Sequence, residues 1–168
     1  MRIVKLQINN FRGIKEGCLI FPGHTVLVGD NNTGKSTILE AIDLVLGPER
    51  LSRRPVIDEH DFYAGRYLDE EKKPVEIFVE AVLIDLGPEQ LRRFFDHIEW
   101  WDTVENILIE GPPEETDRKG VVPALRIGFK GHYDDEEDDF IGNTYFMSPR
   151  NIDGTYDIFG TRDKRNCG

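Results

Sequence analysis

Hydrophobic and polar residues alternate along several short stretches of the chain. Residues 2–8 alternate, with Val4, Leu6 and Ile8 on one face, and this pattern predicts a strand. Residues 75–86 alternate in the same way and carry glutamates on one face, which predicts a half-exposed antiparallel strand. Shorter apolar runs predict further strands at residues 18–21, 25–28, 104–110, 122–130 and 140–147.

Two other stretches follow a helical period. Residues 35–46 carry apolar residues at helical spacing: Ile38, Leu39, Ile42, Val45 and Leu46. This pattern predicts a helix that ends at Gly47-Pro48. A second helix is predicted at residues 88–100, beginning with a proline. Residues 47–74, between these stretches, are rich in charge and contain three prolines, so we expect a long connection with short helical turns.

The strongest chemical signal lies between the third expected strand and the first expected helix. Gly29, Gly34, Lys35 and Ser36 have the spacing G-x-x-x-x-G-K-[ST] of a phosphate-binding P-loop. Small residues let backbone N–H groups turn inward around a phosphate, and the following helix points its positive N-terminal end at the same anion. Lys35 would place its charge on the β- and γ-phosphates, and Ser36 would give its hydroxyl to Mg²⁺.

The charge of the chain is unevenly distributed. Residues 1–60 hold eight basic and seven acidic residues, whereas residues 61–168 hold thirteen and twenty-five. An acidic second half argues against a broad DNA-binding face on this chain. Six consecutive acids at residues 134–139 are typical of a solvated loop.

Length, apolar runs and cysteines bound the class of protein. A chain of 168 residues suits one domain. It contains no apolar run of about 18 residues and no signal-peptide core. The two cysteines lie far apart in the sequence and imply no disulfide framework. We therefore expect a cytoplasmic protein without a membrane segment.

Nucleotide hydrolysis needs more than a P-loop, because an acidic residue at the end of an apolar strand must help to hold Mg²⁺. Asp58 and Glu59 follow only two apolar residues, with Pro55 directly before those. Asp85 follows an alternating strand, and Leu86 stands where a catalytic glutamate would be expected. We therefore expect no catalytic residue in this chain.

The N-terminal sequence resembles a known family. MRIVKLQINNFRGIKEG followed by VLVGDNNTGKSTILEAIDLVLG is similar to the ATPase heads of the SMC and RecF-like ABC group. Within that group it looks most like the OLD-family (overcoming lysogenization defect) ATP-dependent endonucleases. The early P-loop, the N-F-R-G turn and the Asn31-Asn32 pair carry the resemblance, and residues 58–62 (DEHDF) add to it. The specific similarity covers residues 1–65.

The resemblance implies an α/β fold with α+β character, namely the first lobe of an ABC-type P-loop ATPase head, in which a P-loop core joins an antiparallel sheet. It implies ATP and Mg²⁺ as cofactors, with Ser36 as the metal ligand. In such heads Arg12, in the N-F-R-G turn, would approach the nucleotide. The residues expected to bind the nucleotide are Arg12, Gly29, Asp30, Asn31, Asn32, Thr33, Gly34, Lys35, Ser36 and Thr37.

Other parts of such an enzyme are not recognisable in this sequence, including a Q-loop, a signature motif and the Toprim nuclease of OLD proteins. We therefore expect residues 1–168 to be an incomplete N-terminal lobe of a larger enzyme. We expect this lobe alone to bind ATP weakly or not at all, and not to hydrolyse it. The resemblance implies DNA as a partner of the full-length protein, and a homodimer of ATPase heads.

Three hypotheses for function stay open. The first is an ATP-dependent endonuclease, in phage defence or DNA repair, in which ATP binding and hydrolysis control a Toprim nuclease. The second is a RecF-like or SMC-like DNA repair ATPase without nuclease activity. The third is a complete small P-loop kinase or nucleotide sensor, which would need a working Mg²⁺-binding acid such as Asp85.

Overall fold

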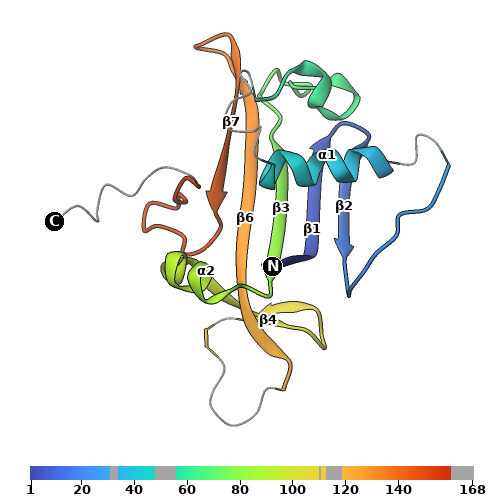
Figure 1. Cartoon of the computed structure of the whole chain (residues 1–168). Coiled ribbons are helices and arrows are strands. Elements are labelled where there is room, and N and C mark those ends of the chain that lie inside the picture. Colours follow the sequence, from blue (N-terminus) through green and yellow to red (C-terminus); the bar gives the residue numbers. More distant parts are fainter. Residues whose placement is uncertain (31–33, 48–55, 110, 113–118, 160–168) are drawn as a thin grey trace.

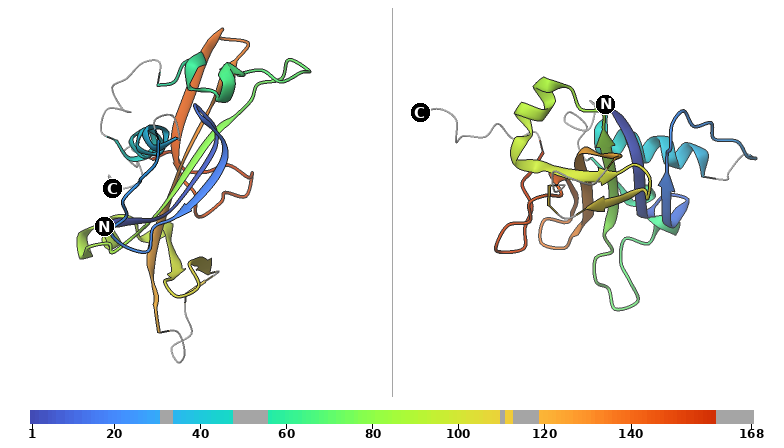
Figure 2. Two further views of the ribbon diagram at one scale, coloured as in Figure 1. Left: turned by 90° about the vertical axis from the view of Figure 1, so that its right-hand side faces the viewer. Right: turned by 90° about the horizontal axis from the view of Figure 1, so that it is seen from below.

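A computed structural model describes residues 1–30, 34–47, 56–109, 111–112 and 119–159. The described part has a mixed α/β fold built on one curled antiparallel sheet (Figures 1 and 2). Its strands are β1 (Arg2–Phe11), β2 (Ile14–Ile20), β3 (Ile77–Ile84), β4 (Ile98–Asp102), β5 (Ile107–Ile109), β6 (Val121–Asp134) and β7 (Asp139–Phe146). Its helices are α1 (Lys35–Leu46), α2 (Pro88–Arg93) and the short 3-10 helices η2 (Glu59–Asp61), η3 (Tyr63–Gly65) and η4 (Phe95–His97).

The long strand β6 organises the sheet. The strand order is β2-β1-β3-β6-β4-β5, and every neighbouring pair is antiparallel. On the side away from β3, the first residues of β6 pair with β4 and its later residues pair with β7. Figure 1 shows β6 running through the length of the molecule, with these two strands at its opposite ends.

The main hydrophobic core lies between α1 and one face of the sheet. In β1 the alternation expected from the sequence is confirmed for Leu6 and Ile8, which are buried here while Gln7 between them is not. Val4, expected on the same face, instead belongs to the second core, because the register of β1 shifts between Ile3 and Lys5. Figure 2 shows α1 lying over this face. Each fully buried aliphatic side chain contributes about 1.5–3 kcal/mol. The buried residues that α1 and its preceding glycine turn bring to this core include Ile38, Ala41, Leu44 and Val45.

A second, smaller core covers part of the opposite face. Val82 and Ile84 of β3 join Val4, Trp101 and Ala124 there. β3 is therefore buried on both faces along most of its length, and the expectation of a half-exposed strand is wrong. The reason is tertiary: β6 and β4 bring Trp101 over the face that the sequence pattern left open.

The helix expected at residues 88–100 is also corrected. α2 ends at Arg93, η4 follows, and the two tryptophans lie in strand β4. Trp100 pairs with Pro123, and Trp101 pairs with Val122 of β6. Aromatic residues favour a pleated, half-buried surface, so pairing with β6 outweighs the short apolar period that suggested a longer helix.

The strand expected at residues 25–28 is absent. These residues have no regular secondary structure, and Val26 and Val28 are 82% and 88% exposed. Leu27 between them packs partly against the main core. A strand needs hydrogen-bonded neighbours for its backbone groups, and the described part of the chain places no strand beside this segment.

Most other expected elements are present. α1 has the predicted bounds, although Leu39 is exposed and Leu44 takes a core position in its place. β6 and β7 cover the expected ranges, whereas β5 is shorter and β2 begins four residues earlier than predicted. The described part of the connection before β3 contains η2 and η3, as the sequence suggested.

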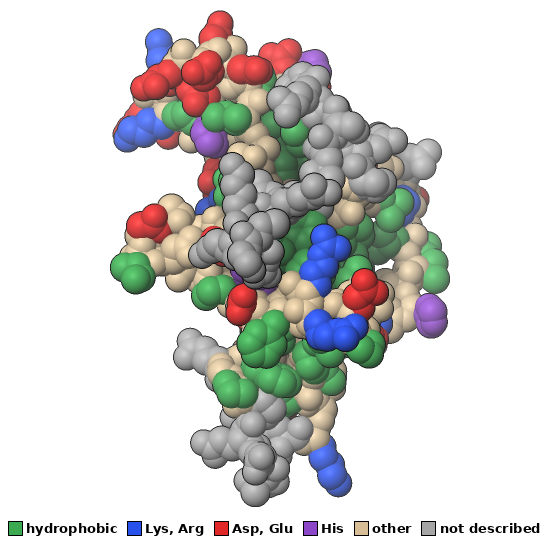
Figure 3. Space-filling model, turned by 60° about the vertical axis from the view of Figure 1, so that its left-hand side comes forward, with side chains coloured by type: hydrophobic (Ala, Val, Ile, Leu, Met, Phe, Trp, Pro, Cys, Tyr) green, Lys and Arg blue, Asp and Glu red, His purple; other side chains and the backbone are tan. Residues whose placement is uncertain are grey.

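The acidic run at residues 134–139 forms the tip of the β6–β7 hairpin, and its central residues are exposed. The prediction of a solvated loop is confirmed. Acidic side chains gather at this end of the molecule in Figure 3. Among the described residues, no helix has the length and apolar character that crossing a membrane requires.

Candidate nucleotide-binding site

The structure describes both ends of the P-loop. Gly29 and Asp30 open the loop, and Gly34 leads into α1, whereas Asn31, Asn32 and Thr33 lie outside the described residues. Gly34 is the N-cap of α1 and has φ 84°, a left-handed conformation that glycine adopts without the strain of a side chain. The second glycine of the motif is therefore needed to turn the chain into the helix.

Lys35 joins the two ends of the loop. Its Nζ donates hydrogen bonds to the carbonyl oxygens of Gly29 and Asp30, each at 2.5 Å. Ser36 is exposed, and Thr37, also expected to bind the nucleotide, is buried. The first turn of α1 carries no acidic side chain, so the positive end of its dipole is not offset there and favours an anion.

The turn between β1 and β2 packs against this first helical turn. A Cβ atom at Gly13 would lie 3.5 Å from Thr37 Oγ1, and one at Gly34 would lie 3.7 Å from the side chain of Ile14. Arg12, in the same turn, has φ 47°. The N-F-R-G turn and the P-loop, separated in sequence, are thus in contact, and contact of Arg12 with a nucleotide stays a prediction.

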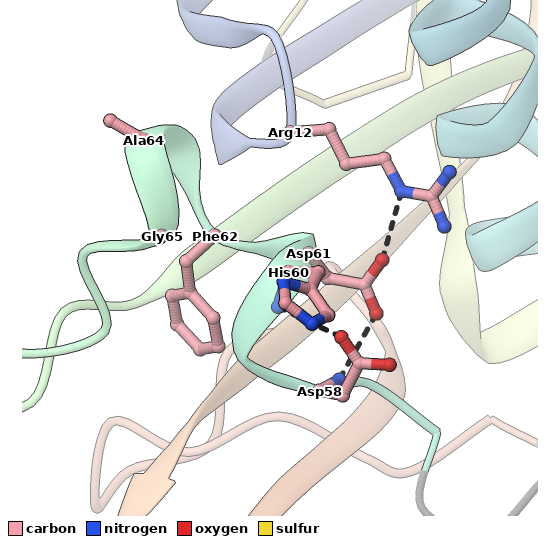
Figure 4. Close-up of a pocket in the computed structure, with 7 residues that line it drawn as sticks. All are labelled: Arg12, Asp58, His60, Asp61, Phe62, Ala64 and Gly65. Atoms are coloured by element: carbon pink, nitrogen blue, oxygen red, sulfur yellow. Dashed lines mark hydrogen bonds and ion pairs between the residues drawn. The ribbon is translucent and has the colours of Figure 1, made fainter.

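Arg12 is held by two carboxylates from other elements. Its Nη1 lies 2.5 Å from Glu40 Oε1 on α1, and its Nε lies 2.8 Å from Asp61 Oδ1 on η2. Burial acts to lower the pKa of Arg12, but the hydrogen bonds and charges of Asp61 and then Glu40 outweigh it and raise that pKa. The guanidinium stays charged and points toward the P-loop helix (Figure 4).

A pocket of about 460 Å³ lies beside this ion pair. It is lined by Arg12, Asp58, His60, Asp61, Phe62, Ala64 and Gly65 (Figure 4). Asp58 and Asp61 form a reciprocal capping box around η2, and Asp61 is only 3% exposed. The D-x-x-D spacing of residues 58–61 is a sequence signal that could have identified Asp61 as part of a capping box. No comparable pattern in the sequence marks Glu40 as the second partner of Arg12.

The two acids weighed as Mg²⁺ ligands have other roles in the structure. Asp58 caps η2 and ends no strand, and Asp85 pairs with Arg2 at 2.8 Å at the end of β3. Within the described ranges, no group of three His, Cys, Asp or Glu residues is arranged to hold a metal ion. Mg²⁺ binding by Ser36 stays a prediction.

A curled antiparallel sheet packs on a helix that begins at Gly34-Lys35-Ser36, and the domain has a mixed α/β fold. The chain belongs to the family described as AAA ATPase domain, which it matches over residues 1–157. Membership of an ATPase family implies that the domain binds a nucleotide.

Shorter matches relate the chain to individual proteins. It is 45% identical over 58 residues to the OLD nuclease of Thermus scotoductus, a match that covers 34% of this chain and 11% of that protein. It is 43% identical over 58 residues to the DNA replication and repair protein RecF of Brucella abortus, covering 34% of this chain and 15% of RecF. An uncharacterized protein of Escherichia coli, YbjD, is 41% identical over 49 residues, covering 29% of this chain and 9% of YbjD.

These matches agree with the predicted resemblance to OLD-like and RecF-like ATPases, which is confirmed. The matched part of the chain spans only 11% and 15% of the lengths of the first two relatives.

Proposed function

We propose that this domain binds ATP with Mg²⁺ at the P-loop of residues 29–37, and that ATP hydrolysis in the full-length protein controls an activity on DNA. The observation that carries the proposal is the arrangement of Lys35. Its ammonium group closes the loop onto Gly29 and Asp30, at the N-terminus of α1, whose first turn carries no acidic residue. A phosphate entering the loop would replace these carbonyl contacts with a stronger charge-assisted pair.

The residues around the loop have distinct roles in this proposal. Backbone N–H groups at the start of α1 would bind phosphate oxygens, and Lys35 would neutralise their charge. The exposed Ser36 would bind Mg²⁺, which shields the phosphates and stabilises the charge that develops on them. Thr37 is buried against the Arg12 turn and would transmit the position of the loop to that turn.

The preferred form of the full-length protein is an OLD-type ATP-dependent endonuclease. The match to an OLD nuclease at 45% identity supports it, as does the family resemblance of the N-terminal sequence. A RecF-like DNA repair ATPase without nuclease activity is the second candidate, because the match to RecF has the same length and nearly the same identity. In both, ATP-dependent pairing of two heads is part of the proposal.

Nucleotide titration of the full-length protein tests ATP binding. Lys35→Ala is expected to weaken Mg²⁺-dependent ATP binding at least about tenfold, the loss of one charge-assisted contact to phosphate. Lys73→Ala is the matched control, because Lys73 is exposed and pairs with Glu71 away from the P-loop. Equal ATP affinity in wild type and Lys35→Ala would refute the proposed site.

Incubation of the same protein with DNA separates the two candidates. ATP-dependent cleavage of plasmid DNA in the presence of a divalent metal supports the endonuclease. Retention of DNA with ATP turnover and no cleavage supports the RecF-like ATPase. ATP binding without any response to DNA would contradict both.

A further inference from the structure

Arg12 is fixed on one side far more firmly than on the other. Its backbone N–H donates to the carbonyl oxygen of Asp61 at 2.8 Å, and its Nε lies 2.8 Å from Asp61 Oδ1. On the other side, Nη1 pairs with Glu40. The Asp61 side chain is 4% exposed, whereas the Glu40 side chain is 42% exposed. Because an exposed ion pair is screened by water, the Glu40 contact exchanges more easily.

Asp61 is itself held in place. Its second carboxylate oxygen, Oδ2, accepts a hydrogen bond from the backbone N–H of Asp58 at 3.1 Å. Asp58 in turn accepts the backbone N–H of His60 at 2.8 Å. A backbone bridge between Phe11 and Phe62 joins the two segments directly beside Arg12. Asp61 therefore fixes the direction of the guanidinium, as Figure 4 shows.

Glu40 lies on the same helix face as the P-loop hydroxyl. Residues four apart lie one above the other on an α-helix, so Glu40 stands one turn beyond Ser36. The turn that carries Arg12 touches Thr37, in the first turn of α1. The Nη1 end of the guanidinium, at Glu40, thus lies about one helical turn from Ser36, where the proposed phosphate site begins.

We propose that Asp61 is a positioning residue for nucleotide binding, and that Arg12 exchanges Glu40 for a phosphate group of ATP while its Nε stays on Asp61. This inference rests on the proposed function of the P-loop. Glu40 is then a competing counter-ion, which keeps Arg12 neutralised until a nucleotide arrives. Asp61 acts only through Arg12.

ATP affinity of the full-length protein tests this exchange, because the two carboxylates have opposite effects. Glu40→Gln removes the competitor and is expected to tighten ATP binding about threefold, the size of one exposed ion pair. Asp61→Asn removes the negative charge that holds the Arg12 side chain and is expected to weaken ATP binding about tenfold, as loss of a charge-assisted hydrogen bond would. If the carboxylates were only structural supports, both variants would weaken binding.

A double-mutant cycle and a matched control complete the test. Adding Asp61→Asn to Arg12→Ala is expected to cause no further loss of affinity, because Asp61 acts through Arg12. Asp85→Asn is the control, since Asp85 makes the same 2.8 Å contact to an arginine Nε at the far end of β3, and its ATP affinity should equal that of wild type.

Weaker ATP binding in Glu40→Gln, or a full Asp61→Asn effect on top of Arg12→Ala, would overturn the exchange. The Lys35→Ala and Arg12→Ala variants distinguish failure of this exchange from failure of the proposed ATP site. If Lys35→Ala abolishes binding while Arg12→Ala leaves it unchanged, the proposed function stands and this inference fails. If the wild-type protein binds no ATP, the proposed function fails.

Discussion

At the scale of single residues, two partly buried arginines each pair with two carboxylates. Arg12 is shared by Glu40 and Asp61, and Arg126 is shared by Glu99 and Glu80. Arg126 makes a bidentate contact with Glu99 at 2.9 Å but lies 3.5 Å from Glu80. Because a buried charge is costly unless it is well paired, Glu80 is the least satisfied member of either group.

Substitution of Glu80 is expected to change how stability depends on pH. Burial raises the pKa of Glu80 above its ordinary value of 4.5, against the opposing charges of Arg126 and Lys5. The folded state therefore holds this proton more tightly than the unfolded state, and stability falls as pH rises from 4.5 through the raised pKa. The free energy of unfolding, measured with urea from pH 4 to 8, should therefore fall with rising pH more in wild type than in Glu80→Gln.

The control for this pH experiment is Glu89→Gln, because Glu89 is an exposed glutamate on α2. That variant should follow the pH dependence of wild type. A free energy of unfolding that rises with pH in wild type relative to Glu80→Gln, over the same window, would contradict the direction of the pKa shift.

At this scale the sequence predicts the residues of the phosphate loop, which are adjacent in the chain, but not the partners of Arg12, which are far from it in sequence. Gly34, Lys35 and Ser36 are adjacent, so their spacing alone predicts a phosphate loop. The partners of Arg12 come from α1 and η2, 28 and 49 positions away. Such contacts depend on how the elements pack, which a one-dimensional pattern does not contain.

At the scale of elements, the successful predictions include those with strong periodicity. Leu6 and Ile8 of β1 and the buried residues of α1 repeat at the period of a strand and of a helix, whereas β6 and β7 are predicted from shorter apolar runs. Two errors fall on residues 25–28 and 88–100, where short apolar runs fit more than one structure, and a third is the exposure of β3, which is buried on both faces despite its alternating sequence. Strand pairing explains the structure of both segments. The tryptophan segment pairs with β6 as strand β4, and no described strand pairs with residues 25–28.

Substitutions in residues 25–28 test the absence of this strand. The double variant Val26→Ser with Val28→Ser should change the free energy of unfolding by no more than about 0.5 kcal/mol, as exposed substitutions do. Leu27→Ala should cost about 1–2 kcal/mol, because Leu27 packs partly against the main core. Chemical denaturation of the three proteins gives the comparison. A loss above that of Leu27→Ala in the double variant would show that the valines are buried in solution.

At the scale of the whole molecule, two acids considered for hydrolysis, Asp58 and Asp85, make other contacts in the described part of the chain. Asp58 is used as a helix cap and Asp85 pairs with Arg2. Hydrolysis requires an acid that holds the Mg²⁺ shell and a group that orients water. That this chain needs further parts of an enzyme in order to turn over ATP therefore stays a prediction.

The purified 168-residue chain is expected to show no steady ATP turnover, for this reason. A phosphate-release assay at saturating Mg²⁺ and ATP measures it, with Lys35→Ala as the background control. Turnover that Lys35→Ala abolishes would mean that the hydrolytic residues lie within this chain, and would favour the hypothesis of a complete small P-loop enzyme.

The charge distribution makes a separate prediction about DNA. Residues 61–168 carry twenty-five acidic and thirteen basic residues, and the acids of the β6–β7 hairpin are concentrated at one end of the molecule (Figure 3). Protein–DNA affinity depends on cations that replace the counterions of the phosphates, so this face repels a duplex. By fluorescence anisotropy at physiological salt, the 168-residue chain should show no binding to a labelled duplex below about 100 μM, the weak end of non-specific affinity.

Neutral substitutions in residues 134–139 should change the DNA affinity of the full-length protein less than about threefold, because acids remote from the contact surface are screened within about 10 Å. Tighter binding by more than that would place the hairpin beside the DNA and move the contact surface onto this domain.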